Sequence, residues 1–175
     1  MTRNIQAPTY YVPQLGDGPP VFLAGDVAGE QDWQAQAGAQ LANAGAVVLN
    51  PRQAGVPDTG LAEASQQAAW ACQHRRLPTL VMLFWFPRTD PAAVAVTALL
   101  ELGAELIRPR SPQRRLVVGA APGYPCRGEI LLQIANERPD LVVHHTLDRV
   151  IAAATQELAA LGAGRRARTA PVRLR

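Results

Sequence analysis

Short, fully apolar runs separated by helical patterns fill the chain from residue 20 onward. These runs predict buried strands at residues 21–24, 46–49, 80–86, 116–119 and 141–144. Apolar residues at helical spacing predict the intervening helices, at residues 31–44, 61–76, 92–107, 129–137 and 147–161. Because the strands are apolar throughout rather than alternating, helices should cover both faces of the sheet. The pattern therefore predicts an α/β fold with a doubly wound, five-stranded parallel sheet, a flavodoxin-like or Rossmann-like three-layer sandwich.

The two ends of the chain do not share this pattern. Residues 1–19 are polar and rich in proline, which predicts an extended amino-terminal arm. Residues 163–175 hold five of the seventeen arginines and no acid, which predicts a poorly ordered tail with at most weak attraction to nucleic acid. The domain proper is expected at residues 20–162, and residues 1–162 hold twelve arginines and fourteen acids, a net charge of −2.

Composition removes several classes of chemistry. All basic residues are arginine, so neither a P-loop lysine nor a Schiff-base lysine is available. The two serines, Ser65 and Ser111, lie in no G-x-S-x-G turn, which argues against a serine hydrolase. The two cysteines and three histidines show no metal-binding spacing, so we expect neither a metal nor an organic cofactor. The opening residues lack a signal-peptide pattern and no apolar run has the ~20 residues of a membrane span, which predicts a cytoplasmic protein without membrane contact.

Candidate binding residues gather where the predicted strands end. Ligands of such folds bind beyond the carboxyl ends of the strands, which here carry Gly25-Asp26, Asn50-Pro51-Arg52 and Trp85-Phe86. No G-x-G-x-x-G follows the first strand, which disfavours a dinucleotide. The aromatic rings either stack a heterocycle or pack in the core, and the Gly25 turn either approaches a ligand or is a plain tight turn.

Seven short motifs, taken in order, resemble one known family. They are V-F-L-A-G (21–25), D-W-Q (32–34), L-N-P-R (49–52), Trp70, L-F-W-F-P (83–87), E-L-G (101–103) and V-V-G-x-x-x-G-Y (117–124). They resemble the nucleoside 2-deoxyribosyltransferase-like family, and the resemblance covers about residues 20–160. The resemblance implies a flavodoxin-like fold that cleaves the N-glycosidic bond of a nucleoside and passes the sugar to another base or to water. It also implies a homo-oligomer, because relatives often complete their site with a neighbouring subunit.

The resemblance assigns the nucleophile to Glu101, the Glu of E-L-G. A carboxylate can capture the oxocarbenium-like sugar as an ester, as in retaining glycosidases. On a helical wheel Glu101 lies away from an apolar stripe through Val96, Leu99, Leu100 and Gly103, and Gly103 is expected to let the helix approach the sheet. A position in the first half of a helix should favour the ionised carboxylate through the macrodipole.

The departing base needs a proton, so a second acid is expected near Glu101. Relatives usually carry Glu after the tryptophan that is Trp70 here, whereas this chain has Ala71, and Thr79 replaces a further acid. The remaining candidates are Asp90, which can equally be a turn or N-cap residue, and Asp26. Losing both acids leaves open a catalytically degenerate module that binds nucleosides or nucleotides without turnover.

The candidate site residues divide into catalytic candidates and substrate-binding candidates. Glu101 and Asp90 are the catalytic candidates, and Arg52 can bind a 5′-phosphate or be an ordinary surface arginine. The candidate substrate-binding residues are Gly25, Asp26, Trp33, Asn50, Arg52, Trp70, Trp85, Phe86, Thr97 and Tyr124.

Overall fold

One parallel sheet runs through the computed structural model, which describes residues 3–27, 32–52 and 61–169. Within these ranges the sheet has six strands in the order β1-β3-β2-β4-β5-β6. The strands are β1 (Arg3–Gln6), β2 (Pro20–Gly25), β3 (Val47–Asn50), β4 (Leu80–Phe86), β5 (Arg114–Ala120) and β6 (Val143–His144). Apart from β1, this is the 2-1-3-4-5 order of the doubly wound flavodoxin-like class.

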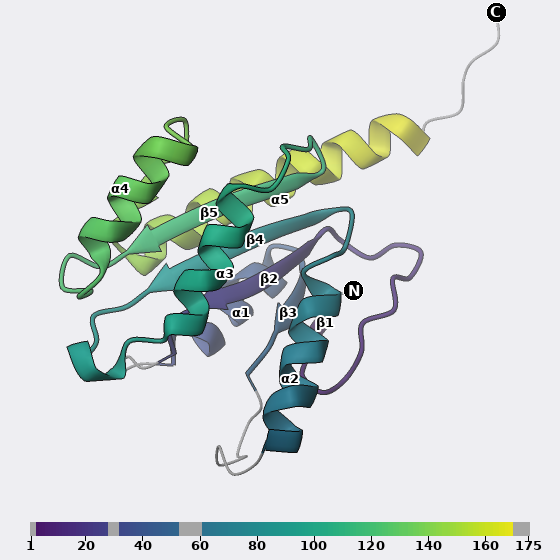
Figure 1. Cartoon of the computed structure of the whole chain (residues 1–175). Helices are drawn as coiled ribbons and strands as arrows, with labels where there is room; N and C mark the ends of the chain where they lie inside the picture. The colour runs from purple at the N-terminus through teal and green to yellow at the C-terminus, as the bar shows by residue number, and fades with distance from the viewer. Residues whose placement is uncertain (1–2, 28–31, 53–60, 170–175) are drawn as a thin grey trace, which may run out of the picture.

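Helices cover the sheet on both sides, so the predicted three-layer α/β fold is confirmed (Figure 1). The helices are α1 (Trp33–Asn43), α2 (Leu61–His74), the 3₁₀ turn η1 (Pro91–Ala93), α3 (Val96–Leu106), α4 (Arg127–Glu137) and α5 (Leu147–Thr169). Alternate strand residues feed two separate cores: Met82 and Phe84 pack with α2, α3 and α4, while Val81 and Leu83 pack with α1 and α5. Two buried faces explain why the strands are apolar at every position.

The predicted strand number was one too low. Residues Arg3–Gln6 of the predicted extended arm form β1, which pairs in parallel with β3 and places Ile5 opposite Leu49. The arm gives only a weak sequence signal because an edge strand needs few apolar residues, and of β1 only Ile5 is buried. The edge strand is defined by its pairing with β3, a contact that the local periodicity of the arm does not contain.

Trp70 and His74 of α2 hold the segment that follows β1. The Trp70 indole Nε1 donates to the carbonyl of Thr9 at 2.7 Å, and the Tyr11 backbone N–H donates to His74 Nε2 at 3.0 Å. The His74 Nδ1 then donates to the Trp70 carbonyl at 2.7 Å, so the imidazole is neutral with one nitrogen accepting. Burial lowers the pKa of His74, which agrees with this neutral form. The arm is thus part of the folded domain.

The predicted buried stripe of α3 was wrong. Ala98, Leu102 and Leu106 face the sheet, whereas Val96 and Leu100 are exposed. Gly103 does not mediate close packing, since a Cβ built there meets no atom within 4 Å. The helix is apolar on most of its circumference, so periodicity alone does not select the inward face.

The last helix is longer than predicted. α5 continues to Thr169, although its pattern suggested an end at residue 161. Alanine and arginine are both strong helix formers, so the Ala- and Arg-rich segment extends the helix beyond the sheet (Figure 1). The rest of the predicted tail, residues 170–175, lies outside the described residues. Among the described helices, none has the length and apolar character needed to cross a membrane.

Candidate functional site

The strand order reverses at β2, which lies between β3 and β4. A crevice is expected at such a point, beyond the carboxyl ends of the strands. A pocket of about 650 Å³ lies there, in the size range of sites for small molecules. Its described lining residues come from β2, α1, the end of β3, α2 and α3: Phe22, Leu23, Ala24, Gly25, Val27, Gln34, Pro51, Arg52, Gln67, Ala68, Ala71, Arg75, Ala95, Thr97, Ala98, Leu100, Glu101 and Ala104.

Glu101 and Arg75 form an ion pair inside this pocket. Arg75 Nη1 lies 3.4 Å from Glu101 Oε1, and the two side chains are only 20% and 21% exposed. Thr97, one helical turn before Glu101, lines the same wall. Among the described lining residues, Glu101 is the single carboxylate and Arg52 and Arg75 are the cations. The pocket thus brings together four of the predicted site residues: Gly25, Arg52, Thr97 and Glu101.

Burial raises the pKa of Glu101 above its ordinary value, and the negative charge of Glu105 raises it further. The Arg75 guanidinium opposes both effects and lowers the pKa of this carboxyl. The expected help from the helix macrodipole does not dominate. Glu101 is the sixth residue of α3, and the macrodipole acts mainly within the first turn. Arg75 is therefore the group that favours the ionised carboxylate.

Gly25 ends β2 at the base of the pocket, where no side chain fits. Its φ of +128° is a region that favours glycine, and a Cβ there would lie 2.0 Å from the Trp85 carbonyl oxygen. The next residue continues the contact, since the Asp26 N–H donates to the same carbonyl at 3.1 Å. Gly25 thus makes a tight turn against the carbonyl of Trp85 in β4, and the alternative that its backbone approaches a ligand stays a prediction.

Asp26 is fully buried and braces the pocket rather than lining it. Its Oδ2 accepts a hydrogen bond from the Ala95 N–H at 2.9 Å and one from the Tyr124 hydroxyl at 3.3 Å. Burial and the Asp26 charge both raise the pKa of Tyr124, so this phenol stays protonated and donates. Asp26 thus ties the end of β2 to the start of α3, and the predicted catalytic alternative for Asp26 is not supported.

Arg52 reaches the pocket from the end of β3. The Asn50 side-chain oxygen accepts from the Arg52 backbone N–H at 2.9 Å, which shapes the turn without placing Asn50 in the lining. The Arg52 guanidinium pairs with Asp32 at 2.8 Å, and both side chains are about half exposed. Asp32 Oδ1 also caps α1 by accepting from Ala35. The loop after β3 is thereby fixed to the start of α1.

The predicted aromatic residues do not face the pocket. Trp33, Trp85, Phe86 and Tyr124 are at most 6% exposed and belong to the cores, and Trp70 is fully buried. Their rings are covered because each packs into one of the two cores that flank the sheet. For Trp70, Trp85 and Phe86 this is the core-packing alternative that the sequence left open beside stacking on a base.

Asp90 also lies outside the described lining. It is exposed, and its Oδ1 accepts from the Ala92 N–H at 2.8 Å as the N-cap of η1. This is the N-cap alternative that the sequence left open. A second carboxylate is accordingly absent from the described lining of the pocket, where Ala71 occupies the wall of α2.

Arg75 and Gln34 line the pocket, although the sequence pattern predicted no role for either of them. Arg75 resembled an ordinary basic residue near a helix end, and only the packing of α2 beside α3 turns it toward Glu101. Gln34 belongs to the D-W-Q motif but carried no assigned role. It is 2% exposed, it lines the pocket, and among the described residues its Oε1 has no hydrogen-bond partner. Over the described ranges, no group of three His, Cys, Asp or Glu is placed to hold a metal ion.

The fold and the pocket define a class of flavodoxin-like α/β protein with a partly buried carboxylate at the switch point of the sheet. Residues 18–122, more than half of the 175, match the model of the family described as nucleoside 2-deoxyribosyltransferase like. The chain therefore belongs to the nucleoside 2-deoxyribosyltransferase-like family. No individual curated protein sequence matches the chain significantly.

Replacing Gly25 tests the close approach at the base of the pocket. Gly25→Ala should lower the free energy of unfolding by about 3 kcal/mol or more, because a Cβ meets backbone and the φ is strained. Gly128→Ala is the matched control, since a Cβ in that turn of α4 meets nothing within 4 Å. It should change stability by between zero and about +1 kcal/mol in urea denaturation. Equal stabilities of the two variants would contradict the described geometry.

Proposed function

We propose that the protein cleaves the N-glycosidic bond of a nucleoside or nucleotide, with Glu101 as the nucleophile, and transfers the sugar to a base or to water. The observation that carries the proposal is the half-buried Glu101 carboxylate in the pocket at the switch point. Membership of the deoxyribosyltransferase-like family supports the same chemistry. The proposed class is a nucleoside 2-deoxyribosyltransferase-like transferase or N-glycoside hydrolase.

In the proposed reaction a Glu101 oxygen attacks the anomeric carbon of the sugar. The N-glycosidic bond breaks, its electron pair leaves with the base, and an ester joins Glu101 to the sugar. Water or a second base then attacks the same carbon and restores the free carboxylate. Arg75 lowers the pKa of Glu101 and so favours the ionised carboxylate against the effect of burial, and no metal or organic cofactor is required for either step.

The charges of the pocket favour an anionic substrate. The described lining holds two cations, Arg52 and Arg75, and one carboxylate, Glu101. Arg52 also pairs with Asp32, which lies outside the lining, but this pair is half exposed and therefore open to competition from an anionic ligand. Arginine binds phosphate through paired N–H donors, so a nucleotide with its 5′-phosphate near Arg52 fits better than a neutral nucleoside. The unpartnered Gln34 oxygen is available to a sugar hydroxyl or a base N–H.

The alternative is a module that binds the same ligand without turnover. Its support is Ala71 on the wall of α2, where relatives usually carry Glu, and the position of Asp90 outside the described lining. A leaving base without a nearby acid takes its proton from water, which costs the rate gain of general acid catalysis, about 10²–10⁴-fold. The enzyme and the binding module should both bind the ligand, but only the enzyme should convert it to products.

A panel of nucleosides and their 5′-monophosphates, with and without an acceptor base, tests the proposal. Chromatography should detect base release or exchange by the wild type and a loss on the order of 10³-fold or more in Glu101→Gln, because the nucleophile is removed while the side-chain shape is kept. Binding in a thermal-shift assay without turnover would favour the binding module. Full activity of Glu101→Gln would exclude the proposed nucleophile.

The acidic side of the pH–activity profile reports the ionisation of Glu101. Activity requires the carboxylate, so it should fall as the pH drops through the pKa of Glu101, which burial raises above its ordinary value. Arg75→Met removes the charge that lowers this pKa, so the acidic limb should move to higher pH. Glu105→Gln removes a charge that raises it, so the limb should move to lower pH. Shifts in the same direction for both variants would contradict this electrostatic assignment.

Homo-oligomerisation remains a proposal, supported by an apolar stripe on α3. Val96, Leu100 and Ile107 are 64%, 69% and 70% exposed, and Leu100 also lines the pocket. A neighbouring subunit on this stripe would cover apolar surface and close the pocket mouth.

Sedimentation velocity tests this contact. The wild type should sediment above the monomer mass at micromolar concentration, and the double variant Val96→Glu, Ile107→Glu should sediment as a monomer. Neither substitution changes a residue of the described pocket lining. A monomeric wild type would show that the stripe does not join subunits.

A further inference from the structure

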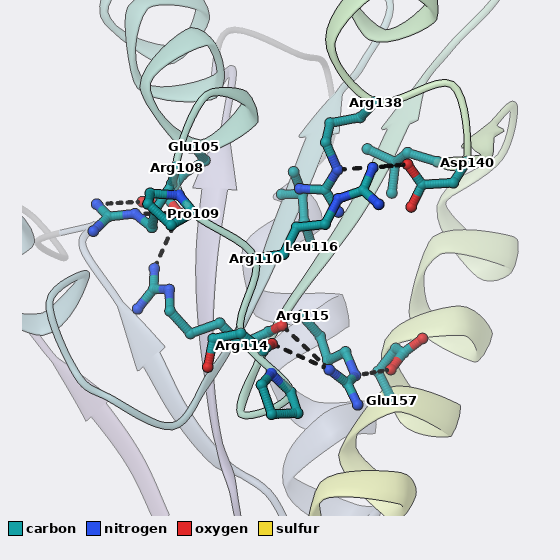
Figure 2. A pocket seen from close by; sticks show the side chains of 13 residues that line it. Glu105, Arg108, Pro109, Arg110, Arg114, Arg115, Leu116, Arg138, Asp140 and Glu157 are labelled. Carbon is teal, nitrogen blue, oxygen red and sulfur yellow. Dashed lines mark hydrogen bonds and ion pairs between the residues drawn. The ribbon is translucent and has the colours of Figure 1, made fainter.

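A second hollow lies at the amino end of β5, at the opposite end of the sheet from Glu101. It encloses about 430 Å³ between the loop after α3, the start of β5, the loop after α4, and α5. Its charged lining residues are five arginines and three acids: Arg108, Arg110, Arg114, Arg115, Arg138, Glu105, Asp140 and Glu157. Figure 2 shows these side chains around the hollow in three groups: Arg108 and Arg114 beside Glu105, Arg110 and Arg138 beside Asp140, and Arg115 beside Glu157. No part of the proposed glycosidic reaction uses it.

Two of the three acids of the hollow each pair with two arginines, so the acids do not balance its positive charge. Glu105 pairs with Arg108 and with Arg114, each at 3.0 Å. Asp140 is likewise the partner of both Arg110 and Arg138, while Glu157 pairs with Arg115. Five guanidiniums against three carboxylates leave a net charge of +2 in this one hollow.

The positive net charge of the hollow contrasts with the negative net charge of the rest of the domain. Residues 1–162 contain twelve arginines and fourteen acids, so seven arginines and eleven acids remain once the hollow's residues are removed. The rest of that range therefore carries −4, and the hollow carries +2. Separation of this kind gives a local positive potential that attracts anions.

The arginines fall into a buried and an accessible group. The side chain of Arg114 is 14% exposed, donates to the Leu77 carbonyl at 2.7 Å and pairs with the 5% exposed carboxyl of Glu105, which fixes the wall. Arg110, Arg108 and Arg115 are 62%, 39% and 33% exposed, so N–H donors of these side chains reach solvent. The accessible guanidinium groups can therefore bind an oxyanion while the buried ion pair of Arg114 and Glu105 stays intact.

The side chain of Arg138 gives independent evidence that the hollow has more N–H donors than hydrogen-bond acceptors. Its Nε is buried and has no hydrogen-bond partner within the described part of the chain, since its ion-pair partner, Asp140 Oδ1, is 3.6 Å away. Arg110 binds that same oxygen, and Figure 2 shows the two guanidinium groups beside Asp140. An additional oxyanion here would relieve Asp140 of one arginine and allow it to pair closely with the other.

We propose that this hollow is a binding site for the phosphate groups of a small polyanion, such as a diphosphate, held by Arg110 and Arg115. A diphosphate carries the two or more negative charges needed to balance the excess, and its oxygens suit bidentate arginine pairs. The volume of about 430 Å³ accommodates a compact ligand of this kind. The site is separate from the Glu101 pocket and does not depend on the proposed glycosidic function.

Titration calorimetry of the full chain with inorganic pyrophosphate tests the site. Wild type should bind, the double variant Arg110→Ala, Arg115→Ala should bind at least about tenfold more weakly, and raising the salt concentration should weaken binding. Arg149→Ala, an exposed arginine of α5 outside both pockets, is the matched control and should bind like wild type. Circular dichroism checks that the substitutions leave the fold intact.

Three further outcomes are decisive. Adenosine diphosphate binding more tightly than pyrophosphate, with the same loss in the double variant, would support the proposal and identify a nucleotide as the source of the phosphates. Loss of pyrophosphate binding in Arg52→Ala but not in the double variant would place the anion in the Glu101 pocket and overturn the proposal. Binding of a single-stranded oligonucleotide but not of pyrophosphate would also overturn it, in favour of a nucleic-acid surface.

Discussion

The hydrogen bonds of the buried Asp26 carboxylate fix the geometry of the whole switch point. One oxygen holds the backbone N–H of the residue before α3 and the Tyr124 hydroxyl, which follows β5, so three segments from distant parts of the chain meet at the end of β2. The position of Glu101 along α3 follows from this anchor, because a helix extends as a rigid rod from its first residue. The close approach of Gly25 to Trp85 holds β2 against β4 beside the pocket, which Gly25 lines.

α3 connects the two charged pockets of the molecule. Glu101 faces the pocket at the carboxyl end of the sheet, and Glu105, one turn later, belongs to the arginine-lined hollow at the amino end. Each carboxylate has an arginine partner from a different element, Arg75 following α2 for the first and Arg114 of β5 for the second. The like charges of the two carboxylates are close enough for Glu105 to raise the pKa of Glu101. The same helix therefore couples the electrostatics of both ends.

The sequence predicted the layered fold well because a run such as Leu80–Phe86, apolar at every position, is typical of a strand buried on both faces. It also predicted that Glu101, Arg52 and Thr97 meet at one end of the sheet. The sequence did not predict correctly which way several side chains point. Trp85 ends a strand at the expected place but points into a core, and α3 is apolar on so many sides that its inward face depends on its neighbours. Arg75 and the arginine-lined hollow required the packing of separate elements, which no local pattern records.

The pairing of β1 with β3 protects the outer side of the sheet. All four residues of β3 are buried, and its backbone groups on that side are paired by a short strand carrying Arg3 and the polar Asn4 and Gln6. A chain shortened past Gln6 would present the apolar β3 as an open edge, able to pair with the same edge of a second copy. The short segment before the first fully apolar strand thus acts as a cover against self-association into extended sheets.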